Sequence, residues 1–244
     1  MSVPWRTREV ALGIVLVAVG ALLVSQAIVL LVGLEEDDTA LIAWLTSISL
    51  GVATFVIVWF LGLRPYRVSL AFLGLKPLGT PRLKVVGMTL GVLMLSLGAT
   101  ALYSYLVGLS GLEILLPPEI PSGIVFPGLG IVLTFLALAV WTPLTEEVFF
   151  RGFIFSGLSS RWGVTGAMVL SALIFSLFHD PLILVAPFNL DLYLSYNATG
   201  VLFPIFITGL LLAWLYRQTG SLWTSIAAHA GQNAAALAAT VYGV

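Results

Sequence analysis

Three short stretches of this sequence carry side chains that could do chemistry, and each lies inside an otherwise apolar run. They are EEVFFR, FSLFH and HAGQN, and their charged or strongly polar residues include Glu146, Glu147, Arg151, His179, His229 and Asn233. Carboxylates and imidazoles are common general acids and bases in enzymes, and amides can donate hydrogen bonds. Such a set could activate a water molecule and stabilise a developing negative charge.

The two glutamates of the first stretch are expected to have different tasks. On a helix, Glu147 and Arg151 share a face and can form an ion pair, whereas Glu146 is rotated by about 100° and is left for another role. A structural ion pair that pins two helices also explains Glu147 and Arg151. Thr142 and Pro143 predict a helix start just upstream, with Thr142 as N-cap. The carboxylates would then lie near a positive helix end, which favours anions.

The third stretch belongs to a run of small residues, AAHAGQNAAALAA. Helices that face lipid are richer in Leu, Ile and Phe, so this helix is expected to be buried, with close backbone contacts to its neighbours. His229 and Asn233 are four residues apart and share one face. A lone histidine in a membrane is often only a satisfied hydrogen-bonding group, but the amide one turn further favours a functional pair.

Together these groups predict peptide hydrolysis inside a membrane. A carboxylate and a histidine around one water molecule form a general-base pair. A second histidine and an amide can donate hydrogen bonds to the oxyanion that forms on a carbonyl. The sequence has no HExxH zinc motif, no cysteine, no GxGD pair and no GxSx motif coupled to a histidine, so the other intramembrane protease schemes do not fit.

The elements that must hold these residues are transmembrane helices. The chain of 244 residues is 60% hydrophobic and 9% charged, whereas soluble domains carry about a quarter of their residues as charges. A membrane span needs about 20 apolar residues. The fold class is therefore an all-α polytopic helix bundle, with about seven spans expected at 10–34, 39–63, 85–112, 128–161, 164–179, 200–216 and 222–242.

The charges between these spans predict an orientation. Basic residues occur on one side, at Arg6, Arg8, the segment 64–84, Arg161 and Arg217, and acidic residues on the other, at 35–38, Glu113, Glu119, Asp180 and Asp191. The positive-inside rule then predicts a multi-pass protein of the cell membrane with a cytoplasmic N-terminus and an external C-terminus. The net charge of −1 argues against a nucleic-acid partner. The expected partners are the lipid bilayer and a peptide or membrane-protein substrate, and the oligomeric state is left open.

The three stretches also match known motifs. EEVFFR fits EExxxR, FSLFH fits FxxxH, and HAGQN fits HxxxN. In these motifs the sequence resembles the CPBP family, which includes the type II CAAX prenyl endopeptidases and many bacterial relatives. The resemblance covers about residues 128–243. It divides the chain into N-terminal helices at 1–127, with the basic segment 64–84, and a CPBP-like catalytic core at 128–244.

The resemblance implies roles for the motif residues. Glu146 and His179 would activate the water molecule, and His229 and Asn233 would stabilise the oxyanion. By the same resemblance, Glu147 and Arg151 would support the site.

Members of the family are often called metalloproteases, so a metal is a second expectation. The candidate ligands for Zn²⁺ are Glu146, Glu147, His179 and His229, enough in number for a tetrahedral site. The same residues serve equally well without a metal, and glutamate-dependent catalysis that requires no cofactor is the favoured interpretation.

Two other functions fit the same residues. A non-enzymatic immunity or scaffold protein could use this fold, and a proton-coupled transporter could use the buried glutamates and histidines as a relay. Prenylated proteins, bacteriocin precursors and other membrane proteins are all compatible substrates for the protease.

Overall fold

The computed structural model describes residues 3–32, 39–79, 81–112, 115–117, 120, 122–179 and 198–242. These residues form helices and connecting turns, and no strand occurs among them. The helices outside the central stretch are α1 (Thr7–Val32), α2 (Thr39–Val58) with its π-helical continuation η2 (Trp59–Leu63), α3 (Arg82–Ser110), α9 (Leu202–Thr219) and α10 (Leu222–Tyr242). Short 3₁₀ turns are η3 (Leu70–Leu73), η5 (Ser122–Ile124), η6 (Gly128–Gly130) and η9 (Ala198–Val201).

The central stretch carries the glutamates and runs without interruption from η6 to residue 178. Its parts are α4 (Ile131–Phe135), the π-helical η7 (Leu136–Trp141), α5 (Thr142–Glu147), the π-helical η8 (Val148–Phe155) and α6 (Ser156–Phe178). Gly163 has φ 68° and ψ 172° and divides α6 into two limbs. Glycine adopts such a positive φ without the steric cost of a Cβ, so the chain can reverse there.

The expected helix start at Thr142 and Pro143 is wrong. Trp141 (φ −67°, ψ −49°) and Thr142 (φ −57°, ψ −53°) are both helical, and the helix passes through the proline. The preceding turns are π-helical, and such wider turns are one of the local adjustments that let a proline stay inside a membrane helix. The carboxylates therefore lie in the middle of a long helix and not at a helix end.

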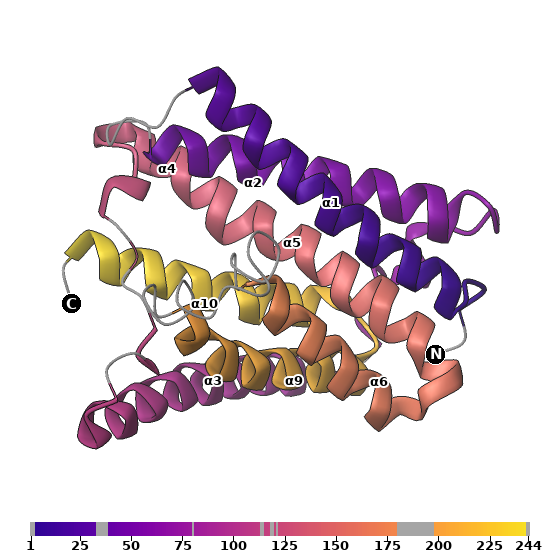
Figure 1. The fold of residues 1–244 in the computed structure, drawn as a ribbon. Coiled ribbons are helices and arrows are strands. Elements are labelled where there is room, and N and C mark those ends of the chain that lie inside the picture. The colour runs from indigo at the N-terminus through magenta and orange to yellow at the C-terminus, as the bar shows by residue number, and fades with distance from the viewer. Residues whose placement is uncertain are drawn as a thin grey trace.

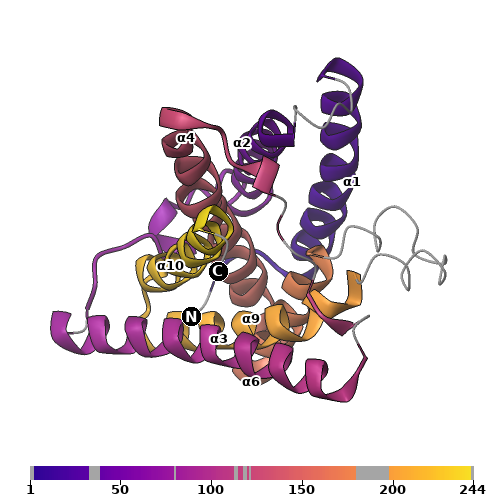
Figure 2. The same cartoon turned by 90° about the vertical axis from the view of Figure 1, so that its left-hand side faces the viewer.

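The helices are arranged around this central stretch. Its first part, from α4 to η8, crosses the molecule between α1 and α2 on one side and α3, α9 and the second limb of α6 on the other, with α10 beside it (Figures 1 and 2). The residues of α2 pack on η7 and α5, and those of α10 pack on the same two segments from the opposite direction. The middle of the central helix is thereby enclosed by helices that are distant in sequence.

An aromatic core fixes the part of the central helix that follows the glutamates. All eight residues of η8 are buried, and Phe149, Phe153 and Phe155 are among the largest buried side chains. Trp5 stacks on Phe153, with ring centroids 5.7 Å apart, and its indole Nε1 donates a hydrogen bond of 2.9 Å to the Phe153 carbonyl oxygen. The segment before α1 thus helps to hold the back of the central helix.

The outer surface is apolar, as a lipid-facing surface must be. Large hydrophobic side chains point outward from α1 and α3, including Leu30, Leu31, Leu83 and Met94. Among the described residues, five helical stretches are long and apolar enough to cross a membrane: 7–31, 39–63, 82–110, 128–178 and 202–219.

The expected all-helical class is confirmed, and the expected bounds of the apolar runs agree with the helices to within a few residues. The fourth stretch includes both limbs around Gly163, and α10 is not among the five. Seven spans and a cytoplasmic N-terminus stay predictions. The acidic residues on which that orientation partly depends, at 35–38 and at positions 113, 119, 180 and 191, lie outside the described residues.

Candidate active site

The Glu147–Arg151 ion pair lies at the centre of the bundle. The Arg151 Nη1 donates to Glu147 Oε1 at 2.7 Å, and both side chains are completely buried. The second guanidinium nitrogen, Nη2, donates to the carbonyl oxygen of Gly209 on α9 at 3.2 Å. Arg151 thus joins the central helix to α9 and compensates the buried carboxylate, which would otherwise be very costly.

The same carboxylate holds His229 of α10. The distance from His229 Nδ1 to Glu147 Oε1 is 3.0 Å, and His229 is buried. An ionised carboxylate only accepts hydrogen bonds, so Nδ1 carries the hydrogen and Nε2 is directed elsewhere. Glu147 therefore sets both the orientation and the proton position of the imidazole, as carboxylates do for catalytic histidines in general.

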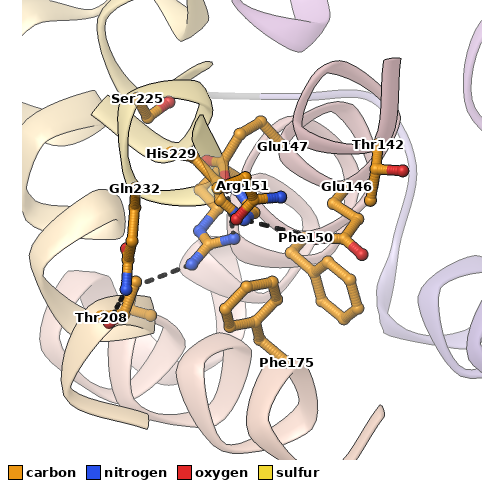
Figure 3. A network of polar contacts seen from close by, with 12 residues as sticks. Thr142, Glu146, Glu147, Phe150, Arg151, Phe175, Thr208, Ser225, His229 and Gln232 are labelled. Carbon is orange, nitrogen blue, oxygen red and sulfur yellow. Dashed lines mark hydrogen bonds and ion pairs between the residues drawn. The ribbon is translucent and has the colours of Figure 1, made fainter. Parts of the chain in front are cut away.

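The Glu146 side chain turns away from the Glu147–Arg151 pair (Figure 3). Its carboxylate lies near both histidines. Its Oε2 is 3.6 Å from His229 Nε2 and 3.9 Å from His179 Nε2. These distances are too long for direct hydrogen bonds. Oε2 is buried and has no hydrogen-bond partner among the described residues. A buried polar atom of this kind, surrounded by other polar groups, is where a water molecule binds in proteins.

His179 is oriented by the last turn of α6. Its Nδ1 lies 2.8 Å from the carbonyl oxygen of Phe175, one helical turn earlier. Since a carbonyl oxygen only accepts, Nδ1 donates, and in the neutral form of the ring Nε2 is then an acceptor on the side of Glu146. The structure therefore brings Glu146, His179 and His229 together.

Phe175 forms the floor of the site and has no assigned role in the sequence-based interpretation. Its ring lies below Arg151, whose Cζ is 4.2 Å from the ring centroid, a cation–π contact (Figure 3). The same ring contacts His179 and His229, with centroid distances of 4.5 and 5.7 Å. Its place in the FxxxH motif, one turn before the histidine, was the signal that could have identified it.

Asn233 does not touch the carboxylates. Its amide Nδ2 donates a hydrogen bond of 2.8 Å to the carbonyl oxygen of Leu138 on η7. Its neighbour Gln232 belongs to a separate buried network with Ser96 on α3 and Thr208 on α9. The role of Asn233 as an oxyanion donor stays a prediction.

A cavity of about 190 Å³ opens beside Glu146. Its polar lining includes Glu146, His179, Ser47 and Thr142, and the remaining lining is mainly apolar and comes from α1, α2 and η8. The first two helices therefore contribute a wall to the cavity, which the sequence alone did not indicate. The small residue Gly51 lies in this wall, and a Cβ there would collide with Trp141.

The four candidate metal ligands do not form one ligand set. Glu147 is committed to Arg151 and to His229 Nδ1. Among the described residues, no group of three or more His, Asp or Glu side chains is arranged to hold a metal ion. The description as a metalloprotease is therefore not supported.

The comparison with protein families gives one match. Residues 128–235 match the family described as type II CAAX prenyl endopeptidase Rce1-like. The matched core of the chain is similar to the Rce1-like family. The resemblance read from the three motifs is thereby confirmed, and all three lie within the matched residues. Neither the curated proteins nor the solved structures that were compared include a match. At the level of the family, this match supports the interpretation of the protein as an intramembrane protease of the CAAX type.

Proposed function

We propose that this protein is an intramembrane endopeptidase that hydrolyses a peptide bond with water activated by Glu146 and His179. The observation that carries the proposal is the buried, unpartnered Glu146 Oε2 with an imidazole Nε2 on either side, at 3.6 and 3.9 Å. The Rce1-like match of the core is an independent support for the same reaction class.

The catalytic water is held by two acceptors. It donates one hydrogen bond to Glu146 Oε2 and the other to the free Nε2 of His179, which leaves an oxygen lone pair for attack. As the oxygen bonds to the peptide carbonyl carbon, one proton passes to Glu146. The carbonyl oxygen becomes an oxyanion, and the resulting intermediate is tetrahedral.

His229 is the donor that stabilises the oxyanion. Because Nδ1 is bonded to Glu147, Nε2 can donate only when the ring is protonated. When the intermediate collapses, protonated Glu146 returns its proton to the leaving nitrogen. The C–N bond then breaks to give a carboxyl group and an amine.

The cavity next to Glu146 indicates which chemical groups of a substrate would fit beside the site. Its walls on α1, α2 and η8 include Val17, Ala21, Leu50 and Phe149. Such a surface binds an apolar side chain or lipid group better than a charged one. The proposed substrate is therefore a membrane-embedded or lipid-linked peptide that has an apolar group beside the bond that is cut.

The first test compares the purified protein with its Glu146→Gln variant in lipid vesicles. Both are incubated with fluorogenic peptides that are membrane-embedded or prenylated. The variant is expected to lose a factor of about 10²–10⁴ in rate, the usual contribution of a general base, while its unfolding temperature stays close to that of the wild type. The matched control is Glu9→Gln at the start of α1, which should cleave at the wild-type rate.

The alternatives give different results in the same experiment. Equal cleavage by wild type and Glu146→Gln would contradict the proposed mechanism. If neither cleaves but both support the same cellular activity, a scaffold or immunity role replaces the enzyme, and proton-driven solute uptake into the vesicles would identify a transporter. Because the proposed chemistry needs no metal, a strong chelator is expected to leave the cleavage rate unchanged.

A further inference from the structure

The hydrogen bond between Asn233 and Leu138 is placed where the central helix lacks a donor. In η7 the helix has the π register, since the Thr142 backbone N–H donates to the Ala137 carbonyl oxygen five residues earlier. The next N–H in this register would belong to residue 143 and would donate to Leu138. Residue 143 is proline, which has no backbone N–H. The amide of Asn233 donates to that carbonyl instead, at 2.8 Å.

A neighbouring carbonyl is held from the opposite side of the helix. Ser47 of α2 donates from Oγ to the Ala137 carbonyl oxygen at 3.2 Å, and the Thr142 hydroxyl donates to the same oxygen at 3.0 Å. The indole Nε1 of Trp141 donates a hydrogen bond of 3.2 Å to the Ser47 carbonyl oxygen. Two helices thus hold the π-helical turn before Pro143, α2 at Ala137 and α10 at Leu138.

This turn immediately precedes the catalytic carboxylates. Glu146 is three residues, or less than one helical turn, beyond Pro143. Its Oε2 must remain within a few ångströms of two histidines on other helices. A carbonyl without a donor inside a bundle is costly, so loss of the Asn233 bond would shift or unwind the segment that aims Glu146.

We propose that Asn233 is a positioning residue, whose amide replaces the N–H missing at Pro143 and so fixes the helix that carries Glu146. This inference rests on the proposed function only for its kinetic readout. It differs from the role of oxyanion donor, because it assigns the Asn233 amide to the enzyme's own backbone and not to the substrate.

The test restores the missing donor. Asn233→Leu keeps a similar side-chain size but removes the amide, and Pro143→Ala supplies a backbone N–H in the register that reaches Leu138. Both single variants and the double variant are purified and compared with wild type. Asn233→Leu alone is expected to lower kcat by about 100-fold with little change in KM, the size expected from a misplaced catalytic group. In the Pro143→Ala background, Asn233→Leu is expected to lower kcat by less than about tenfold.

A second readout does not depend on activity. Hydrogen–deuterium exchange in the peptides that cover residues 136–147 is expected to rise in Asn233→Leu and to return toward wild type in the double variant. The matched control is Gln232→Leu, the adjacent amide, whose partners Ser96 and Thr208 are on other helices. Pro143→Ala is not expected to rescue any defect of Gln232→Leu, because that side chain does not bond to the central helix.

The outcomes distinguish a positioning role of Asn233 from a role as oxyanion donor. An equal loss of kcat from Asn233→Leu in both backgrounds, with unchanged exchange, assigns Asn233 to the oxyanion and overturns the inference. Unchanged exchange in a protein that cleaves no peptide also overturns it. A rise in exchange that Pro143→Ala reverses supports it even if the protein proves not to be a protease. If Asn233→Leu does not fold, Asn233→Ala is compared in the same two backgrounds.

Discussion

At the scale of residues, Glu146 and Glu147 are adjacent in sequence but face different surroundings because they point in different directions from the helix. Glu147 is completely buried, and its Oε1 is bound by both Arg151 and His229, whereas Glu146 faces the cavity and contacts the two histidines only at 3.6 and 3.9 Å. Each carboxylate keeps one buried Oε2 without a hydrogen-bond partner among the described residues. A carboxylate held by two short contacts organises its surroundings, and one without a direct protein hydrogen bond is left for a water molecule and for proton transfer. The helical rotation of about 100° between neighbours makes this division possible.

The Glu147–Arg151 pair allows a test at this scale. Arg151→Met keeps an apolar stem over Phe175 but leaves the Glu147 charge uncompensated, so it is expected to destabilise the protein by about 3–5 kcal/mol. The double variant Glu147→Gln, Arg151→Met removes both charges and is expected to recover most of that loss. Thermal or denaturant unfolding in detergent measures both. A double variant as unstable as Arg151→Met would show that the packing of the arginine, and not its charge, matters.

At the scale of elements, close helix packing positions the site. Gly209 of α9 lies against α6, where a Cβ on Gly209 would be 3.0 Å from both Cα and Cβ of Ala172. Its carbonyl oxygen also accepts the hydrogen bond from Arg151. Small residues at helix contacts allow such approach in membrane proteins, and here the approach brings a backbone acceptor to the buried arginine.

Replacing this glycine is expected to separate the two helices. Gly209→Leu should destabilise the protein by about 1–3 kcal/mol through overpacking. It should also lower activity, because the displaced carbonyl oxygen at position 209 moves away from Arg151. Gly98→Leu on α3 is the matched control, since a Cβ at Gly98 meets no atom within 4 Å. Unfolding temperature and cleavage rate are measured for both variants. Equal behaviour of the two would contradict a packing role for Gly209.

At the scale of the whole molecule, the helices imply a sidedness that labelling can determine. α1 begins and α10 ends at opposite ends of the bundle, while the turn between the limbs of α6 lies at the end where α1 begins (Figure 1). The basic residues predict that the end of the bundle with the start of α1 and the α6 turn is cytoplasmic. This arrangement is compatible with an odd number of crossings.

The absence of cysteine from the sequence makes this experiment direct. In intact cells, a membrane-impermeant maleimide is expected to label Tyr242→Cys at the end of α10 but not Arg161→Cys near the turn. Inverted membrane vesicles are expected to give the opposite result. Labelling of both variants from the same side would contradict the predicted orientation. Both positions are exposed, so a failure to label reports the membrane and not burial.

The sequence by itself determined the helical class, the approximate helix bounds and the grouping of Glu146, His179 and His229 in one site. These depend on apolar run length and on the spacing of charges, which are local properties of the chain. It was wrong at Pro143, because the donors that hold the neighbouring turn come from Ser47 and Asn233, about 95 residues away on either side. Only the tertiary structure decided that α1 and α2 line the cavity, that Phe175 contacts His229 and Arg151, and that the Asn233 amide bonds to Leu138. Each is a contact between helices that are distant in sequence, and no periodicity within a single helix specifies its partners.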